Sequence, residues 1–540
     1  MLLSVPVVAR LVLVGGGHTH CKLIREWPVP SGDDEVRVLV SESARAVYSG
    51  MVPGVLSGQY RLPEAQIALD KLARRRGWLF LQAEVTGISV RERVVRARLR
   101  RAGAPAVCVR LHYEVLSVNV GSATRLPGGV QLRPGCVVGA RPIGALAQAA
   151  RGWERRLQAA SASSSFRLVV LGAGAAGVEL ALALQRRLTR VVRDGDDRVQ
   201  VTLVAAWRST LSEATWQRVR HELQRARVQL IDTTRQRVQC SVEEYDAADS
   251  ITPSLPIGDL VIREETAETA TAPAALHRIP FDALLFTTGA AAPSWLSDAT
   301  DLATSPQGFI RVRSTLQSVT ADEVFAAGDC AEWDGERGPL PKSGVYAVRQ
   351  AAVLRRNLRR MLRAAVSPTS TATPARTPWT KSPPLEVFRP QRRYLSLINL
   401  SNGSALGSWG PVTVQGSVLW RWKDWLDRGW MRPFPRPDAT EEDAKRNPDG
   451  DTDRSVASGR ENGNVDAGGG MADAFTPEEA AALLWLGQRQ PERDLTTPAA
   501  DWMTQLKARL RIDDAFRNAV WQLCAQRRHP VTVLESLRRE

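Results

Sequence analysis

The chain has 540 residues, which is too long for one hydrophobic core and predicts about three or four units. Hydrophobic residues make up 44 % of it, enough to form sizeable cores. The net charge of +15 comes almost entirely from arginine, which indicates either attraction to anionic partners or an arginine-rich codon usage. No nucleic-acid-binding module accompanies this charge, so nucleic acid is excluded as the expected partner.

The cysteines and the N-terminus bear on the compartment. The six cysteines are far apart in sequence, so no local redox disulfide or zinc knuckle is predicted, no metal site is expected, and a reducing compartment is the simplest interpretation. The aliphatic run Leu11–Val14 leaves no room for a signal peptide. The longest apolar stretch, Leu168–Leu184, contains Glu179 and falls short of the ~20 residues of a spanning helix. We therefore expect a cytoplasmic protein, with peripheral membrane contact as an option.

A first strand–turn–helix unit is predicted at the N-terminus. Leu11–Val14 is a buried strand, a glycine-rich turn follows, a helix runs to Trp27, and Val36–Val40 is the next strand. Glycines at such a turn let the backbone approach a pyrophosphate, which the helix N-terminus then binds. The predicted dinucleotide-binding residues of this turn are Gly15, Gly16, Gly17, His18 and Thr19.

Two details of this unit deserve separate predictions. His20 replaces the third glycine of the pattern, so the helix is expected to pack differently against its strand. Glu42 follows the second strand and is the candidate for the adenosine ribose, although it also fits a solvated loop acid.

A second unit begins at the strand Leu168–Leu171 and has all three glycines of the fingerprint. The helix Val178–Leu188 and the strand Val199–Val204 follow. The expected ribose acid is replaced by Ala205-Ala206, with Arg208 close by. An arginine there would accept a 2′-phosphate or be a surface residue, so NADH and NADPH both stay open. The predicted nucleotide-binding residues are Gly172, Gly174, Ala175, Gly177, Arg208 and Gly289, where Gly289 ends the strand Ala283–Thr287.

The segments farther along the chain complete the predicted organisation. Residues 241–278 are expected to be an inserted loop, and Tyr394–Leu400 and Val412–Trp420 are expected strands of a small unit. The predicted division is 1–145 and 301–363 for FAD binding, 146–300 for NAD(P) binding, 364–386 as a disordered insertion, 387–435 as an interface or membrane-association unit, 436–474 as a disordered linker and 475–540 as a helical tail.

A short strand that ends in Gly328-Asp329 completes a constellation with the two glycine turns. Over residues 9–362 the chain resembles the pyridine nucleotide-disulfide oxidoreductase superfamily. The segments 118–122, 139–143 and 286–289 also match the pattern of this superfamily. The resemblance implies an α/β fold with two Rossmann-like three-layer domains, and FAD and NAD(P)H as cofactors. It also implies that the Asp329 carboxylate binds a ribitol hydroxyl of FAD and that Gly121 lies at the flavin.

The step Gly177-Val178-Glu179 is similar to that of type II NADH dehydrogenases, whose glutamate lies near the nicotinamide and the flavin. The resemblance makes Glu179 the candidate functional acid, while a buried helix carboxylate is the alternative. The helix that starts near Lys342 is expected to direct its N-terminus at the flavin, with Lys342 and Val345 beside the cofactor. Gly344-Val345 replaces the family's Ala-Gln dipeptide at the quinone, so the acceptor is not fixed.

A narrower resemblance covers residues 9–435. It is to the oxidoreductase domain that is fused ahead of selenide, water dikinase in some organisms, and no kinase domain follows here. It rests on the segments 13–20, 48–54, 344–350, 394–400, 407–410 and 420–424.

The unit at 387–435 is rich in tryptophan, arginine and lysine. In type II dehydrogenases the corresponding helices lie on the membrane, and this composition suits that interface. Packing against the flavin domain or in a homodimer explains it equally.

Three functions are therefore expected in turn. The first is electron transfer from NAD(P)H through FAD to a quinone or another small acceptor. The second is reduction of a sulfur or selenium compound, with Cys21 as a thiolate favoured by the adjacent helix start. The third is a non-catalytic flavin-binding accessory role in selenophosphate synthesis. The cluster His18, His20 and Cys21 fits a metal or thiol site less well than simple packing of a helix start.

Overall fold

The structure is a computed structural model. It describes residues 5–28, 36–101, 104–128, 130–160, 164–192, 197–207, 211–234, 238–244, 256–264, 275–335, 338–364, 383–391, 395–409 and 412–437. Arg208, residues 365–382 of the predicted insertion, the predicted linker from residue 438 onward and the whole predicted tail 475–540 lie outside these ranges.

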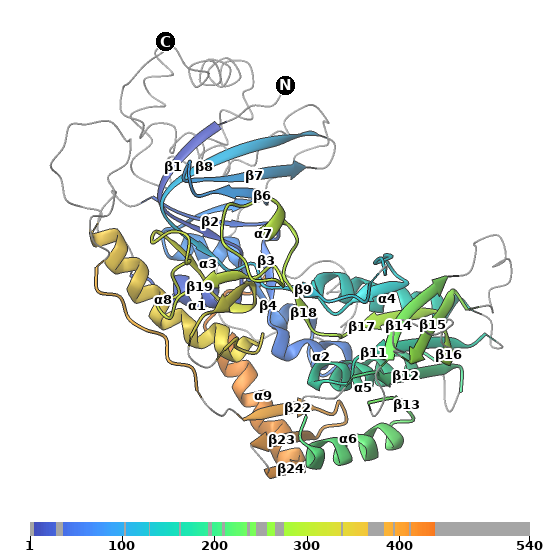
Figure 1. Cartoon of the computed structure of the whole chain (residues 1–540). Coiled ribbons are helices and arrows are strands. Elements are labelled where there is room, and N and C mark those ends of the chain that lie inside the picture. Colours follow the sequence, from blue (N-terminus) through green and yellow to red (C-terminus); the bar gives the residue numbers. More distant parts are fainter. Residues whose placement is uncertain are drawn as a thin grey trace, which may run out of the picture.

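The first sheet has the strand order β5-β2-β1-β8-β7-β6, and β20 pairs with β8. The central strands β5, β2, β1, β8 and β20 are parallel, whereas β6 and β7 join them antiparallel. Helix α1 packs against both α3 and α8 (Figure 1). The bounds are β1 Val5–Val14, α1 His18–Glu26, β2 Arg37–Ser41, α3 Leu69–Arg75, β5 Leu79–Gln82, β6 Glu84–Ser89, β7 Val94–Arg101, β8 Ala104–Val118, β20 Val324–Ala326 and α8 Gly344–Ala364.

The second sheet is entirely parallel, in the order β10-β17-β11-β12-β13. The buried strands are continuous aliphatic runs, because both faces of this sheet are covered. The bounds are β10 Val137–Gly139, α4 Ile143–Ala159, β11 Phe166–Leu171, α5 Ala175–Thr189, β12 Val199–Ala205, α6 Glu213–Arg225, β13 Gln229–Asp232 and β17 Ala283–Phe286. Two such sheets confirm the predicted α/β class.

The prediction of a loop at 241–278 is wrong. A three-stranded antiparallel sheet spans this region, made of β14 Val238–Glu244, β15 Gly258–Glu264 and β16 Ala275–Phe281. Leu260, Val261 and Ile262 are buried in it. These strands are short and stand between polar segments, so the overall composition of the region concealed them.

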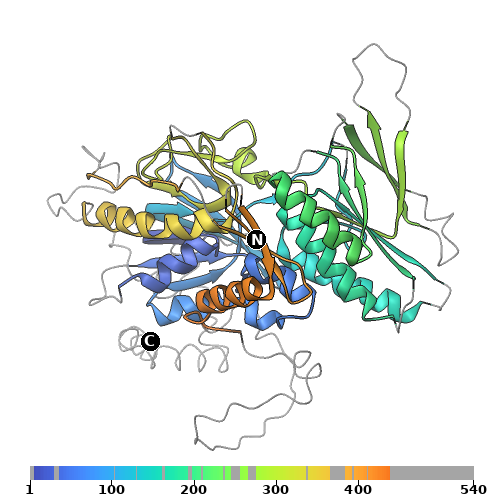
Figure 2. The same cartoon turned by 90° about the horizontal axis from the view of Figure 1, so that it is seen from below.

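Two antiparallel strands connect the first sheet with the second. Strand β9 (Ala123–Thr124) pairs with β18 (Ala290–Ala291), so the outgoing and the returning chain run side by side (Figure 1). Figure 2 shows the two units on either side of this crossing. The smaller elements around them are β3 Arg45–Val47, α2 Val52–Leu56, β4 Gln66–Ala68, α7 Trp295–Asp298, β19 Ile310–Val312 and β21 Ala331–Trp333.

The C-terminal unit is a three-stranded antiparallel sheet followed by a helix. Its elements are β22 Ser396–Asn399, β23 Ala405–Trp409, β24 Val412–Gly416 and α9 Ser417–Met431. The predicted strand 412–420 is too long, because Val-Leu-Trp continues as the first turn of α9, and these residue types suit both structures. Within the described part of the chain, no helix is long and apolar enough to cross a bilayer.

Candidate functional site between the two glycine turns

The first glycine turn joins β1 to α1 and is held by Asn119 at the end of β8. Gly15 has φ +91°, and a Cβ there would lie 2.5 Å from the Asn119 carbonyl oxygen. The Gly17 N–H donates to that oxygen at 3.1 Å, and a Cβ on Gly17 would strike the Asn119 side chain. Only glycine fits at these two positions, and the backbone of the helix start stays accessible to a phosphate.

His20 occupies the place of the third glycine and is fully buried. Its ring nitrogens lie 2.7 Å from the Gly15 carbonyl oxygen and 2.9 Å from the Ser117 hydroxyl, so neither is left for a metal. Burial lowers the pKa of His20 to about 4, and the ring is neutral. At the second turn, a Cβ on Gly177 would collide with the Gly172 carbonyl. The two turns therefore pack differently, with an imidazole in the first where the second requires glycine.

Cys21 does not form a reactive thiolate. Its thiol is 1 % exposed, donates to the Gly16 carbonyl at 3.3 Å, and burial raises its pKa to about 12. The expectation of a thiolate favoured by the helix start is wrong, because burial disfavours the charged form of this thiol.

Two buried polar atoms near the first turn have no partner within the described residues: His18 Nε2 on the first turn of α1 and Ser343 Oγ just before α8. The Thr19 hydroxyl donates to the Ala347 carbonyl at 2.8 Å and so joins these two helix starts. Buried polar atoms without partners are costly, which fits a bound group that supplies them. The glycine backbone and the two side chains without partners thus suit the predicted FAD.

Asp329 lies where the domain crossing meets the first sheet. Its carboxylate accepts from the Ser122 hydroxyl at 3.2 Å and pairs with the Arg141 guanidinium at 3.2 Å. Arg141 also donates to Ser122 at 2.6 Å. Gly328 has φ +70°, and a Cβ there would lie 2.5 Å from the Asn119 side chain. Asn119, Ser122 and Arg141 were not among the predicted site residues, although the first two stand beside Gly121.

The other residues predicted at the flavin are placed as follows. The ammonium of Lys342 donates to the Ala331 carbonyl at 2.6 Å and lies 3.8 Å from the Phe309 ring centroid, and burial lowers its pKa. Val345 is partly exposed on the first turn of α8, and Glu42 is exposed after β2. Gly121 has φ +74° with open space beside its Cα.

The second glycine turn joins β11 to α5. Gly172 has φ +112°, and its carbonyl accepts from the Thr287 hydroxyl at 2.7 Å. Gly174 precedes α5, and Ala175 is its first residue. Gly289 has φ +105° and open space beside its Cα. Ala206, at the predicted ribose position, is buried, so the described residues offer no acid at this place.

Glu179 lies on the second turn of α5 and faces the C-terminal unit. Its Oε1 accepts from the Asn399 N–H at 2.7 Å. Burial raises the pKa of Glu179 to about 7, although the charge of Lys423 and the Asn399 N–H act in the opposite direction. The carboxyl group is therefore able to gain or lose a proton near neutral pH.

Helix α9 connects Glu179 with the first glycine turn. The Lys423 ammonium lies 2.5 Å from Asp427 Oδ2 and donates to the Gly50 carbonyl at 2.8 Å. The Tyr48 hydroxyl donates to Asp427 Oδ1 at 3.3 Å, and the Tyr48 ring meets the His18 ring edge-on at 5.4 Å. Residues from both Rossmann units and the C-terminal unit thus form one connected cluster. Its members Lys423, Asp427 and Tyr48 were not predicted as site residues.

The model of the pyridine nucleotide-disulphide oxidoreductase family matches residues 9–352. This match confirms the superfamily resemblance and the prediction of FAD and a pyridine nucleotide as cofactors. The chain is also similar in fold to NDH2 from Plasmodium falciparum in complex with NADH (12 % identity, 78 % of this chain and 97 % of that chain, TM-score 0.58).

Two further solved structures share the fold. They are the sulfide:quinone oxidoreductase from the hyperthermophilic bacterium Aquifex aeolicus (14 % identity, 80 % of this chain and 93 % of that chain, TM-score 0.55) and a NAD-dependent persulfide reductase from A. fulgidus (18 % identity, 77 % and 66 %, TM-score 0.51). No match was found among curated proteins.

Proposed function

Because the chain belongs to the pyridine nucleotide-disulphide oxidoreductase family, we propose that it oxidises NAD(P)H and passes the electrons through FAD to a small acceptor. FAD and NAD(P)H supply the redox chemistry. The observation that carries the proposal is the cluster that runs from His18 at the first glycine turn to Glu179 just after the second. It joins the two glycine turns, which in this proposal hold the FAD and the nicotinamide nucleotide.

Within this proposal the residues of the chain bind, orient and manage protons. The glycine turns bind the two pyrophosphates through backbone N–H groups. Asp329, held by Ser122 and Arg141, binds the ribitol chain of FAD. Glu179, which titrates near pH 7, holds or releases a proton at its carboxyl group, and Lys423 and Asn399 adjust its charge.

The acceptor is proposed to be quinone-like. This part of the proposal draws on the similarity in fold to NDH2 and to a sulfide:quinone oxidoreductase. Cys21 gives no support to the alternative of sulfur or selenium reduction, because its thiol is buried and stays protonated. The association with selenophosphate synthesis rests on the sequence resemblance alone. The alternative of a non-catalytic accessory role rests on the same resemblance.

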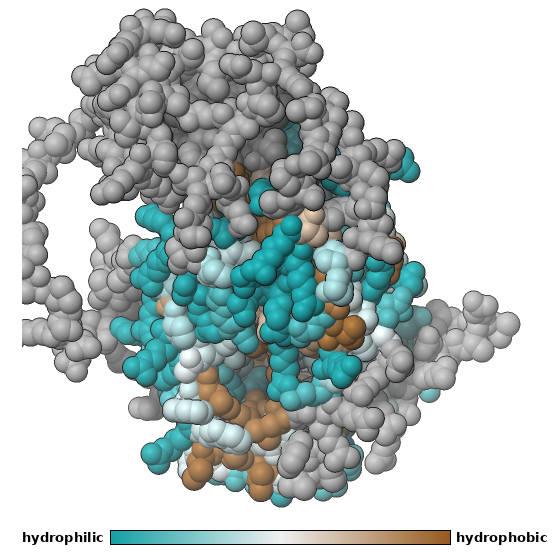
Figure 3. All heavy atoms as spheres, turned by 90° about the vertical axis from the view of Figure 1, so that its left-hand side faces the viewer, coloured by the Kyte–Doolittle hydropathy of each residue, from teal (hydrophilic) through white to brown (hydrophobic). Residues whose placement is uncertain are grey.

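A surface on α9 supports the proposed membrane contact. The buried face of this helix carries Lys423, Asp427 and Met431, four residues apart, whereas apolar side chains point outward. Val418 is 75 % exposed and Trp425 69 %, and Trp422 and Leu426 lie beside them. Figure 3 shows apolar side chains gathered at the lower end of one face, at the level of α9 and β22–β24 in Figure 1. An exposed apolar patch of this kind marks an interaction surface.

Binding to anionic lipid vesicles tests this surface. The full chain is expected to co-sediment with the vesicles, and the double variant Trp422→Ser, Trp425→Ser is expected to stay in the supernatant. If both proteins remain in solution while the wild type sediments as a dimer in analytical ultracentrifugation, the surface is a homodimer interface instead.

The redox proposal is tested on the FAD-loaded protein under anaerobic conditions. NADH and NADPH are added in separate experiments, and the flavin absorption is followed. Reoxidation by a short-chain quinone, by selenite and by a low-molecular-weight disulfide then identifies the acceptor class. Reoxidation by selenite or the disulfide but not by the quinone would contradict the quinone-like acceptor.

A further inference from the structure

A cleft lies on the second Rossmann unit, at the opposite end of α5 from the glycine turn. Its volume is about 940 Å³, and its walls come from the C-terminal halves of α5 and α6 and from residues 400–402 of the C-terminal unit. Arg186 lies 11 residues beyond Ala175 on α5, which corresponds to about 16 Å along the helix axis. The cleft is therefore separate from the place where the glycine turn would bind a pyrophosphate.

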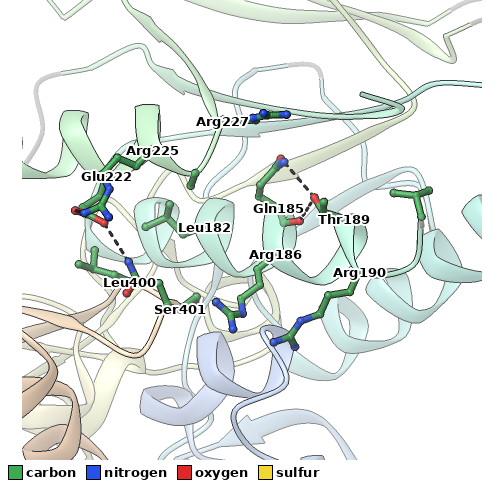
Figure 4. Close-up of a pocket in the computed structure, with 13 residues that line it drawn as sticks. Leu182, Gln185, Arg186, Thr189, Arg190, Glu222, Arg225, Arg227, Leu400 and Ser401 are labelled. Atoms are coloured by element: carbon green, nitrogen blue, oxygen red, sulfur yellow. Dashed lines mark hydrogen bonds and ion pairs between the residues drawn. The ribbon is translucent and has the colours of Figure 1, made fainter. Parts of the chain in front are cut away.

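Positive charge dominates this cleft. Arg186, Arg190, Arg225 and Arg227 line it, and Arg186 and Arg190 leave α5 on the same side (Figure 4). The one acid in the lining is Glu222, whose buried carboxylate already accepts hydrogen bonds from Asn402 at 3.1 Å, Gln415 at 2.9 Å and Arg225 at 3.3 Å. The acid is thus neutralised locally, and it does not offset the other arginines.

Arg186 and Arg190 stand next to each other with like charge. Arg190 donates to the Ser57 carbonyl at 2.8 Å, whereas Arg186 has no hydrogen bond or ion pair within the described ranges of the chain. Partial burial and the charge of Arg190 lower the pKa of Arg186. Two adjacent guanidinium groups favour an anion between them.

Two buried polar atoms in the wall of the cleft have no partner among the described residues. They are Ser401 Oγ, on a residue that is 1 % exposed, and Gln185 Oε1. Ser401 has φ +61°, an uncommon conformation for a residue other than glycine, and its N–H donates to Asn399 Oδ1 at 2.8 Å. Strained and unsatisfied groups in one cleft are typical of a binding site.

Helix dipoles alone do not account for these features. Arginines near the C-terminal ends of α5 and α6 do stabilise the negative ends of both helices. This effect requires no buried hydroxyl without a partner, and it does not explain the left-handed Ser401. A bound ligand explains the charges and the two unpaired atoms together.

We propose that the cleft bounded by Arg186, Arg190, Ser401 and Gln185 binds a small phosphorylated metabolite. The phosphate lies between the two guanidinium groups and accepts from the Ser401 hydroxyl. A hydroxyl or amine of the same ligand donates to Gln185 Oε1. The loop that holds Ser401 also carries Asn399, which donates to Glu179, so the ligand lies next to the loop that contacts the proposed acid.

Calorimetric titration of the FAD-loaded full chain with inorganic pyrophosphate tests the site. Arg186→Gln and Ser401→Ala are each expected to weaken pyrophosphate binding by about tenfold or more, since each removes a hydrogen bond to a charged group. Arg218→Gln is the matched control, because Arg218 is an exposed arginine of α6 outside the cleft, and it is expected to leave the affinity unchanged.

A third variant separates the cleft from the nucleotide site. Gly177→Ala closes the glycine turn and is expected to keep pyrophosphate binding at the cleft. The proposal is overturned if Gly177→Ala abolishes binding while Arg186→Gln keeps it, or if the wild type binds no pyrophosphate.

Discussion

Replacing Glu179 by glutamine is expected to change how the stability of the protein depends on pH. The unfolded chain releases the Glu179 proton near pH 4.5, whereas the folded protein holds it up to about pH 7. The free energy of unfolding therefore falls as the pH rises from 4.5 to 7, and the contribution of the protonated group is lost above that window. At about 1.36 kcal/mol for each unit of pKa, the ionised carboxylate costs the folded state about 3 kcal/mol.

Glutamine cannot ionise, but it still accepts the hydrogen bond from the Asn399 N–H. Near pH 5 the wild type and Glu179→Gln are expected to have similar free energies of unfolding. Near pH 8 the variant is expected to be more stable by about 3 kcal/mol. Equilibrium urea unfolding of the FAD-loaded proteins, followed by flavin fluorescence, measures both values.

The exposed Glu213 at the start of α6 provides the control, and Glu213→Gln is expected to show no such change with pH. A difference between Glu179→Gln and the wild type that is the same at both pH values would refute the reasoning, because the cost assigned to Glu179 arises only on ionisation.

Three more predictions follow from the same cluster and turns. Lys423→Met leaves the Asp427 carboxylate buried without its cation, so the free energy of unfolding in urea should fall by about 3–5 kcal/mol. The same variant should raise the pH at which Glu179 titrates, because the Lys423 charge lowers the pKa of Glu179. An unchanged Glu179 titration would show that the Lys423 charge does not reach Glu179. Gly177→Ala should weaken NAD(P)H binding by about tenfold or more while FAD stays bound, measured by nucleotide titration against the FAD-to-protein ratio. Asp329→Ala should lower FAD affinity by about tenfold or more in the same ratio assay, and full FAD retention would contradict its assignment.

The sequence predicted the site best at the glycine turns, where neighbouring residues determine both the backbone conformation and the binding chemistry. Gly15 and Gly172 could be recognised because each stands between an aliphatic strand and a helix. The structure gives both the positive φ that such a turn requires. The antiparallel sheet at 238–281 was missed because its strands are short and lie between polar segments, so the composition of the whole region predicted a loop.

The cluster around Glu179 shows why the rest of the site could not be predicted. Lys423 and Asp427 stand in a tryptophan-rich helix whose composition fitted a membrane surface and internal packing equally, and only the packing of α9 directs them inward. A spacing of four between a lysine and an aspartate was the one available signal, but such a pair occurs more often on exposed helix faces. His20 likewise departs from the glycine pattern for a reason that appears only with its partners Gly15 and Ser117.

Anaerobic reduction of the bound flavin tests the central claim most directly. The FAD-loaded chain is mixed with NADH and, separately, with NADPH, and the visible absorption of the flavin is recorded. The proposed function predicts that at least one of the two nucleotides bleaches the flavin, more slowly in Gly177→Ala at the same nucleotide concentration. Bound FAD that neither nucleotide reduces would contradict the claim and leave only a non-catalytic role.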